Sequence, residues 1–256
     1  MGLLEGKKAL IFGVANEKSI AWAVAEAYRR EGAEVALAYA GKAVGKRVIP
    51  LGESIGASLI LPCDVRSDAD LAELFATVGS TWGGLDILVH SVAFANKEEL
   101  KGNFLNTTRE GFATALDISA YSLVAMAKEA APLMSGRNGS IIAMTYYGAQ
   151  KVFPSYNVMG VAKAALEASV RYLAEAVGAD GIRVNAISAG PLRTLASAGV
   201  GGFGQIAGHV AGKAPLRRNI SQEEVAGAAL YLASGLSSAV TGEIHFVDNG
   251  YNVIGM

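Results

Sequence analysis

Two tyrosines and a lysine are the side chains best suited to chemistry on a carbonyl oxygen. Tyr156 and Lys163 are seven residues apart, which on one helix is about two turns and therefore one face. A phenol donates a hydrogen bond, and we expect the nearby ammonium to lower its pKa from a reference of about 10. Tyr146, at the end of a predicted strand, adds a second phenol. An ordinary amphipathic helix with a solvated lysine would show the same spacing. The surrounding elements must therefore show whether these residues form a catalytic site.

A second candidate site follows the first predicted strand. From Gly13 to Ala21 the chain reads GVANEKSIA and leads into a predicted helix. A glycine there lets the backbone approach a pyrophosphate, and a helix N-terminus offers free amides and the positive end of a dipole. The segment lacks the full GxGxxG pattern, so on its own it is equally consistent with an ordinary turn.

The elements that must position these groups form an alternating pattern of strands and helices. Continuous apolar runs such as 9–12 and 87–89 are typical of strands covered on both faces, which predicts a parallel sheet. The seven predicted strands are 7–13, 34–39, 58–61, 85–90, 140–145, 183–187 and 244–247. The predicted helices are 20–30, 68–82, 110–134, 156–177 and 223–233.

The strand count favours one fold class over another. An eight-stranded α/β barrel suits the length of 256 residues, but seven strands, the last with no closing helix, favour a doubly wound α/β sheet flanked by helices. Capping-box spacing marks two helix starts, at Thr107 with Glu110 and at Ser221 with Glu224. Because no linker, repeat or change of composition divides the chain, we expect residues 1–256 to form one domain.

Two strand ends point to a nucleotide. Asp64 and Val65 follow the third strand, and the small residues Ser91 to Ala95 follow the fourth. A carboxylate at that edge can accept hydrogen bonds from an adenine amino group, although Asp64 alone could equally start a turn. Since the carboxyl ends of parallel strands share one edge, where open α/β sheets bind ligands, the sequence predicts a dinucleotide site there.

Charge and composition exclude several classes of protein. The formal net charge is −1, which offers no electrostatic footprint for nucleic acid or an anionic membrane. Cys63 is the single cysteine, and no apolar run reaches the roughly 18 residues of a membrane span. We therefore expect a soluble, cytoplasmic protein. His90, His209 and His245 lack metal-ligand spacing, so no metal site is expected.

From about residue 3 to residue 256 the sequence resembles the short-chain dehydrogenase/reductase superfamily. Within it, the sequence looks like the bacterial NADH-dependent, triclosan-sensitive enoyl-acyl-carrier-protein reductases. The main feature is the spacing Tyr156-x6-Lys163, where most of the superfamily has Tyr-x3-Lys. Segments 13–21, 188–196 (SAGPLRTLA) and 215–218 (PLRR) also match. The resemblance implies a Rossmann-type fold and a homotetramer.

The resemblance also implies a reaction and a set of site residues. The reaction is reduction of a trans-2-enoyl thioester on acyl carrier protein to the saturated thioester, in type II fatty acid biosynthesis. Tyr156 would donate to the thioester oxygen and either deliver the proton or only stabilise the enolate, Lys163 would hold the nicotinamide ribose, and Tyr146 would line the pocket. The implied cofactor-binding residues are Gly13, Ser19, Ile20, Asp64, Val65, Ser91, Val92, Lys163, Leu192, Arg193, Thr194, Leu195 and Ala196, and the implied substrate-binding residues are Ala95, Tyr146 and Tyr156.

Two features differ from the subfamily, and a third concerns a segment that would cover the substrate. Ala40 replaces a frequent glutamine, and Lys42 could attract the extra phosphate of NADPH, so NADPH stays an alternative to the expected NADH. Residues 199–208 hold no Lys or Arg with which to dock an acidic carrier protein, which leaves Arg193 or Arg217 for that role. Six glycines fall between residues 199 and 212, so we expect 192–213 to be a mobile lid that orders when ligands bind.

Two other functions are kept as alternatives. A carbonyl or 3-ketoacyl reductase of the same superfamily would share the cofactor geometry, but the tyrosine of its usual Tyr-x3-Lys spacing is missing before Lys163. A dinucleotide-sensing protein without turnover would need no catalytic groups, whereas Tyr146, Tyr156 and Lys163 are all present.

Overall fold

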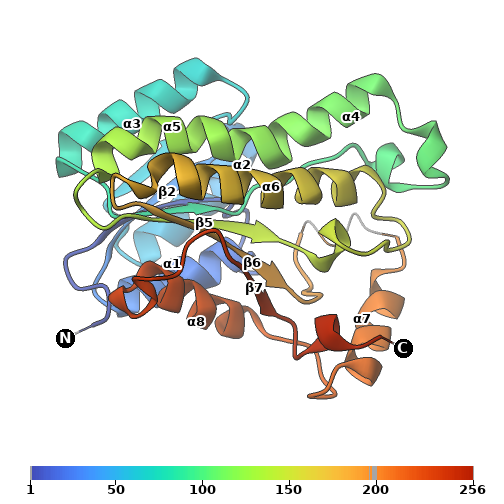
Figure 1. Ribbon diagram of the computed structural model, residues 1–256. Helices are drawn as coiled ribbons and strands as arrows, with labels where there is room; N and C mark the ends of the chain where they lie inside the picture. The colour runs from blue at the N-terminus through green and yellow to red at the C-terminus, as the bar shows by residue number, and fades with distance from the viewer. Residues whose placement is uncertain (1, 196, 198–200, 256) are drawn as a thin grey trace.

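The computed structural model describes residues 2–195, 197 and 201–255, and its elements assemble in three layers (Figure 1). The central layer is a parallel sheet of seven strands in the order β3-β2-β1-β4-β5-β6-β7. The strands are β1 (Lys8–Phe12), β2 (Glu34–Tyr39), β3 (Leu59–Pro62), β4 (Ile87–His90), β5 (Ser140–Thr145), β6 (Arg183–Ala189) and β7 (Ile244–Val247). The predicted doubly wound sheet is confirmed.

The two outer layers are helices that cover opposite faces of the sheet. Helices α3, α5 and α6 pack on one face and α1, α2 and α8 on the other, each face with its own apolar core. The helices are α1 (Ile20–Arg30), α2 (Gly41–Ser54), α3 (Asp68–Trp82), α4 (Arg109–Leu116), α5 (Ser122–Met134), α6 (Val158–Gly178), α7 (Phe203–Lys213) and α8 (Gln222–Ala233). None of the described helices is long and apolar enough to cross a membrane.

Chain order along the sheet creates the switch point that open α/β folds use for ligands. Strand β1 pairs with β2 on one side and with β4 on the other. The chain therefore winds outward in opposite directions from the neighbours β1 and β4. The connections that leave the carboxyl ends of β1 and β4 therefore diverge and open a crevice.

Helix α2 is an element that the sequence pattern did not predict. Pro50 lies inside it, and an interior proline removes a helical hydrogen bond. The helix forms nonetheless because its small, buried positions Gly45 and Gly52 face Tyr39 and Ile60 of the neighbouring strands. Tertiary packing thus overrides a poor local propensity.

The predicted continuous helix over 110–134 is wrong in its middle. Helices α4 and α5 are joined by a π-helical segment, Asp117–Tyr121. The extra residue per turn aims Ser119 at the backbone of Phe94, where its hydroxyl accepts from the N–H at 3.0 Å and donates to the carbonyl at 3.2 Å. Ser122 contacts His90 Nε2 at 2.7 Å. These bonds to distant residues account for the interruption.

One of the two predicted helix caps is displaced by one residue. Ser221 and Glu224 form the expected capping box of α8. At α4 the cap is Thr108, whose hydroxyl accepts from the Gly111 N–H at 2.9 Å. The buried Glu99 carboxylate accepts from both the N–H and the hydroxyl of Thr108, so a contact from outside the helix selects Thr108 over Thr107.

Candidate active site

A cavity of about 800 Å³ lies at the carboxyl ends of β1, β4, β5 and β6. It brings together twelve residues that the sequence marked as cofactor, substrate or catalytic groups: Gly13, Ser19, Ile20, Ser91, Val92, Ala95, Tyr146, Tyr156, Lys163, Leu192, Thr194 and Leu195. Asp64 and Val65 lie outside its lining, and Arg193 lines a neighbouring cavity of about 470 Å³. Ala196 lies outside the described residues.

Gly13 makes the first turn of this cavity possible. Its φ is +104°, a backbone conformation that favours glycine. A Cβ at this position would overlap the backbone carbonyl of Ser91, which follows β4. The glycine is therefore required because the connections from β1 and β4 pass in contact at the switch point.

The N-terminus of α1 fits an anionic group such as a pyrophosphate. The Ser19 hydroxyl does not cap the helix, because it accepts from the N–H groups of Ala15 and Asn16 at 3.0 and 3.1 Å. The first turn contains no acidic residue. Among the described residues, the amides of Ile20 and Ala21 have no acceptor. These donors and the helix dipole are left for a ligand.

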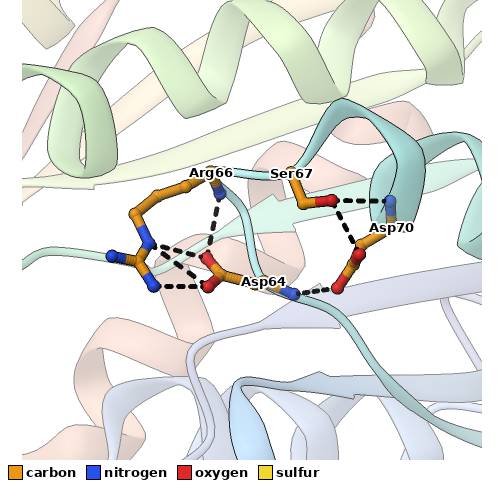
Figure 2. Close-up of polar contacts among 4 residues, drawn as sticks. All are labelled: Asp64, Arg66, Ser67 and Asp70. Atoms are coloured by element: carbon orange, nitrogen blue, oxygen red, sulfur yellow. Dashed lines mark hydrogen bonds and ion pairs between the residues drawn. The ribbon is translucent and has the colours of Figure 1, made fainter.

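Asp64 lies in the turn after β3 and its carboxylate is held by its neighbours (Figure 2). Arg66 donates to both carboxylate oxygens, at 2.6 to 3.2 Å, and its backbone N–H donates to Oδ1 at 3.0 Å. These bonds hold the pKa of the Asp64 carboxyl below its usual value. Ser67 caps α3 through the Asp70 N–H, while the Asp70 carboxylate accepts from the Asp64 N–H at 3.0 Å. The acid expected to meet adenine is thus ionised.

Lys163 is a buried cation with donors to spare. Its side chain on α6 donates from Nζ to the Met144 carbonyl at 2.7 Å. Burial lowers the pKa of Lys163 to about 8, and the negative charge of Glu167 opposes that shift. An ammonium has three N–H donors, and within the described chain one acceptor is present. The remaining donors fit a ligand with hydroxyl groups.

Tyr156 reaches the cavity from a turn and not from a helix. It lies in the turn 154–157, and α6 starts at Val158 because Asn157 has a φ of +39°. The Asn157 amide donates to the carbonyls of Lys101 and Gly102 at 3.4 and 3.3 Å, a contact that local spacing does not reveal. The prediction that Tyr156 and Lys163 share one helix was wrong, but both line the cavity.

The pKa of Tyr156 also differs from the sequence prediction. Burial raises the pKa of this phenol above its ordinary value, and the nearby Tyr146 and Glu167 raise it further. The lowering that we expected from Lys163 is absent: every contribution to the pKa of Tyr156 raises it, and desolvation of the phenolate is the largest. Tyr156 therefore stays protonated at neutral pH and acts as a neutral hydrogen-bond donor.

Tyr156 is closely packed by Tyr146 and by two glycines. The rings of Tyr146 and Tyr156 meet edge to face, with centroids 5.1 Å apart. A Cβ at Gly148 would meet the Tyr156 ring at 2.5 Å, and the Cβ of any residue larger than Gly160 would meet the Gly148 carbonyl oxygen at 2.9 Å. The superfamily's usual tyrosine, four residues before Lys163, would lie at position 159, where Met159 lines the cavity instead.

Sequence reasoning missed much of the apolar lining of the cavity. The residues that it did not assign to the site are Leu100, Met144, Phe153 and Met159. Met144 comes from the strand β5, and its position near the carboxyl end of that strand could have identified it. Phe153 comes from a loop that no local pattern marks. Phe203 and Ile206 of α7 lie in the segment 192–213 that was expected to cover the substrate, although neither was named individually.

The chain is similar over its whole length to known reductases. A family model described as enoyl-(acyl carrier protein) reductase matches residues 13–252. The NADH enoyl-[acyl-carrier-protein] reductase of Aquifex aeolicus is 50% identical over 256 residues, covering 100% of this chain and 95% of that protein. Its crystal structure has a TM-score of 0.96 and covers 100% of both chains.

Two further solved structures carry nicotinamide cofactors. The reductase of Anaplasma phagocytophilum in complex with NAD is 52% identical, with a TM-score of 0.95 and coverage of 100% of this chain and 97% of that one. The reductase of Bacillus cereus with NADP+ and indole naphthyridinone is 47% identical, with a TM-score of 0.98 and full coverage of both chains. The expected family, fold class and enzyme class are confirmed, and the chain belongs to the enoyl-(acyl carrier protein) reductase family of oxidoreductases.

Proposed function

We propose that this enzyme reduces trans-2-enoyl thioesters on acyl carrier protein to saturated acyl thioesters, with NADH as the reductant, in type II fatty acid biosynthesis. The observation that carries the proposal is the placement of Tyr146, Tyr156 and Lys163 on one cavity that also contains the Gly13 turn. The apolar lining leaves room for an acyl chain, and the relatives' names include the substrate and cofactor.

Different residues of the chain would bind different parts of the cofactor. Gly13 and the free amides at the start of α1 would bind the pyrophosphate, and Lys163 would donate to the ribose hydroxyls. Asp64 and Val65, with Ser91 and Val92 and the segment 192–196, complete the set that we assign to the cofactor. When bound, reduced nicotinamide supplies a hydride to the β-carbon of the substrate.

Tyr156 would stabilise the negative charge that grows on the thioester oxygen. The phenol keeps its proton because burial raises its pKa, so it is a donor throughout the neutral range. A donor fixed where charge develops stabilises the transition state more than the ground state. Tyr146 would hold Tyr156 by edge-to-face packing and, with Ala95, confine the substrate.

A spectrophotometric assay tests the reaction and the cofactor. Oxidation of NADH and NADPH is followed separately with a small trans-2-enoyl thioester, and we expect kcat/KM to be at least about tenfold higher with NADH, equivalent to about 1.4 kcal/mol. The reason is that the extra phosphate of NADPH would pair with the exposed Lys42, and one solvated ion pair contributes little binding energy. Matched assays use a ketone and a 3-ketoacyl thioester, which we expect to leave NADH unchanged.

The same assay separates the alternatives. Oxidation with the 3-ketoacyl thioester and none with the enoyl thioester would make the protein a carbonyl reductase. Dinucleotide binding without oxidation by any substrate would make it a sensing protein.

Docking of the carrier protein would use basic residues outside the first turns of α7. Lys213 is the one lysine or arginine of α7 and lies in its last turn. Arg193 and Arg217 are exposed, and Arg217 donates to the Gly212 carbonyl at the end of α7. We propose that these two arginines bind the acidic carrier protein, because opposite charges steer association.

Kinetics on two substrates test this docking surface. We expect Arg217→Ala to raise KM for the thioester on acyl carrier protein by about tenfold, more so at low salt, because exposed charges act at long range there. KM for a small thioester serves as the internal control and should not change. Equal kcat/KM of the unaltered enzyme on the two substrates would argue against productive docking.

The lid and the assembly complete the proposal. Phe203 and Ile206 of α7 line the cavity, which supports residues 192–213 as a segment that covers the substrate. The described elements build one sheet, which supports a single domain over 1–256. Exposed Phe112 and Tyr121 on the α4 to α6 layer support a homotetramer, which sedimentation equilibrium measures. We place the enzyme in the cytoplasm, where reduced nicotinamide cofactors are maintained.

A further inference from the structure

A buried carboxylate lies one helical turn beyond Lys163, and the proposed mechanism does not use it. Glu167 is on the same face of α6 as Lys163 and its residue is 5% exposed. Its Oε1 accepts from the Thr145 hydroxyl at 2.9 Å, and its Oε2 accepts from the Gln150 amide at 3.4 Å. A charge in such a place is costly unless it is paired or hydrogen-bonded, so its presence calls for a role.

The partners of Glu167 and Lys163 flank Tyr146 in the chain. Lys163 donates to the Met144 carbonyl, and Glu167 accepts from the next residue, Thr145. On the other side of Tyr146 follows the 3-10 turn Tyr147–Ala149, and then Gln150, the second partner of Glu167. Two successive turns of α6 therefore fasten the segment that carries Tyr146, which packs against Tyr156.

The charge of Glu167 also acts on Lys163. Burial lowers the pKa of Lys163 to about 8 while Glu167 raises it, so the carboxylate favours the ammonium form. His90, at the end of β4, is neutral because burial lowers its pKa to about 3, to which the charge of Lys163 contributes. Glu167 is thus the negative charge that offsets the burial of Lys163.

Other titratable groups lie on the elements packed against α6, and of these Lys97 shares the cavity with Lys163. Strand β5 has none, and β6 has Arg183, at the opposite end of the strand from the cavity. The remaining groups on α4, α5 and the short helical segments are Arg109, Glu110, Asp117, Tyr121, Lys128, Glu129, Tyr147, Lys97, Glu98 and Glu99. Of these Glu99 is buried and is bonded to Thr108, and Lys97 lines the cavity.

We infer that Glu167 is a positioning residue, which holds the Tyr146 segment against α6 and keeps Lys163 charged for cofactor binding. The inference rests on the proposed function, since it assigns a supporting role to the same site. It predicts two separable effects, one on turnover through the Tyr146 segment and one on the pH dependence of NADH binding through Lys163.

The main test measures the dissociation constant of NADH against pH for the enzyme and for Glu167→Gln. In the unaltered enzyme we expect affinity to fall as the pH rises through about 8, where Lys163 loses its proton. Without the carboxylate charge the pKa of Lys163 falls further, so the midpoint should move down by about one pH unit. We also expect kcat on an enoyl thioester to fall about tenfold, with a smaller change in its KM.

Three further variants separate charge from position and from general damage. Glu175→Gln removes the same charge from an exposed place on α6 and should leave the pH midpoint and kcat unchanged. Thr145→Val removes the hydrogen bond but keeps the carboxylate, so it should lower kcat and leave the midpoint in place. Glu167→Asp should return the midpoint toward that of the unaltered enzyme.

The outcomes distinguish this inference from the proposed function. A folded Glu167→Gln enzyme with an unchanged midpoint and unchanged kcat would overturn the inference while leaving the reaction established. Failure of the unaltered enzyme to oxidise NADH with enoyl thioesters would overturn the function, and the NADH titrations would still decide the role of Glu167. If Glu167→Gln does not fold, the other two variants decide. The inference would be overturned if the pH midpoint of Glu167→Asp did not return toward that of the unaltered enzyme, or if kcat of Thr145→Val were unchanged.

Discussion

Replacing Tyr156 by phenylalanine is expected to lower kcat by about 100-fold while changing the dissociation constant of NADH less than twofold. Removal of one preorganised donor at a developing oxyanion costs on the order of 10²-fold to 10³-fold in kcat. The ring, and with it the packing against Tyr146, is kept, so the loss is confined to the hydroxyl. Stopped-flow or steady-state oxidation of NADH with a saturating enoyl thioester measures kcat, and a fluorescence titration measures NADH binding.

Tyr172→Phe is the matched control for this variant. Tyr172 lies on the same helix, α6, as Lys163, and it is 81% exposed, away from the cavity. Its kcat should equal that of the unaltered enzyme. If Tyr156→Phe kept full turnover, Tyr156 would lose its central place in the mechanism, and Tyr146 would be the remaining phenol to examine.

Replacing Lys163 by alanine is expected to raise the dissociation constant of NADH by about 100-fold. Each hydrogen bond to a charged group contributes about 1.5–3 kcal/mol, and the ammonium has donors beyond the one given to Met144. The variant also removes the group whose pKa is about 8, so NADH binding should no longer weaken as the pH rises through that value. Titrations of NADH between pH 6 and about pH 9.5 measure both effects.

Two control variants test whether the loss of NADH affinity comes from Lys163 itself or from a general loss of structure. Lys163→Met keeps the apolar stem and should show the same loss of affinity as Lys163→Ala. Lys128→Ala removes a lysine that is 82% exposed on α5 and should bind NADH normally. Normal NADH binding by Lys163→Ala would remove the ribose contact from the proposal.

Much of the fold could be predicted because it is set by local pattern. Helix α1 (Ile20–Arg30) and helix α3 (Asp68–Trp82) have the predicted ends, and Ser67 caps α3. Helix α2 could not be predicted, since Pro50 argues against it and its support comes from packing on β2 and β3. The break between α4 and α5 likewise depends on Phe94 and His90, which precede it by some 25 to 32 residues.

The candidate site divides in a similar way. Gly13, Tyr146, Tyr156 and Lys163 could be chosen from residue type and spacing, and they do line one cavity. The segment 192–213 could be expected at the site, but its apolar residues Phe203 and Ile206, and the role that we infer for Glu167, could not be singled out. A glutamate on a helix is usually solvated, and nothing near it in sequence shows that this one faces Thr145.

The sequence by itself determined the order and type of the strands, the glycine turn after β1 and the chemical groups available at the carboxyl ends, because these depend on residues within a few positions of each other. The tertiary structure alone decided that Tyr156 lies in a turn, that its pKa is raised, and that Lys163 is buried beside a carboxylate. The physical reason is that desolvation and hydrogen bonding at the site come from segments far apart in the chain, and their sum appears only when the sheet has formed.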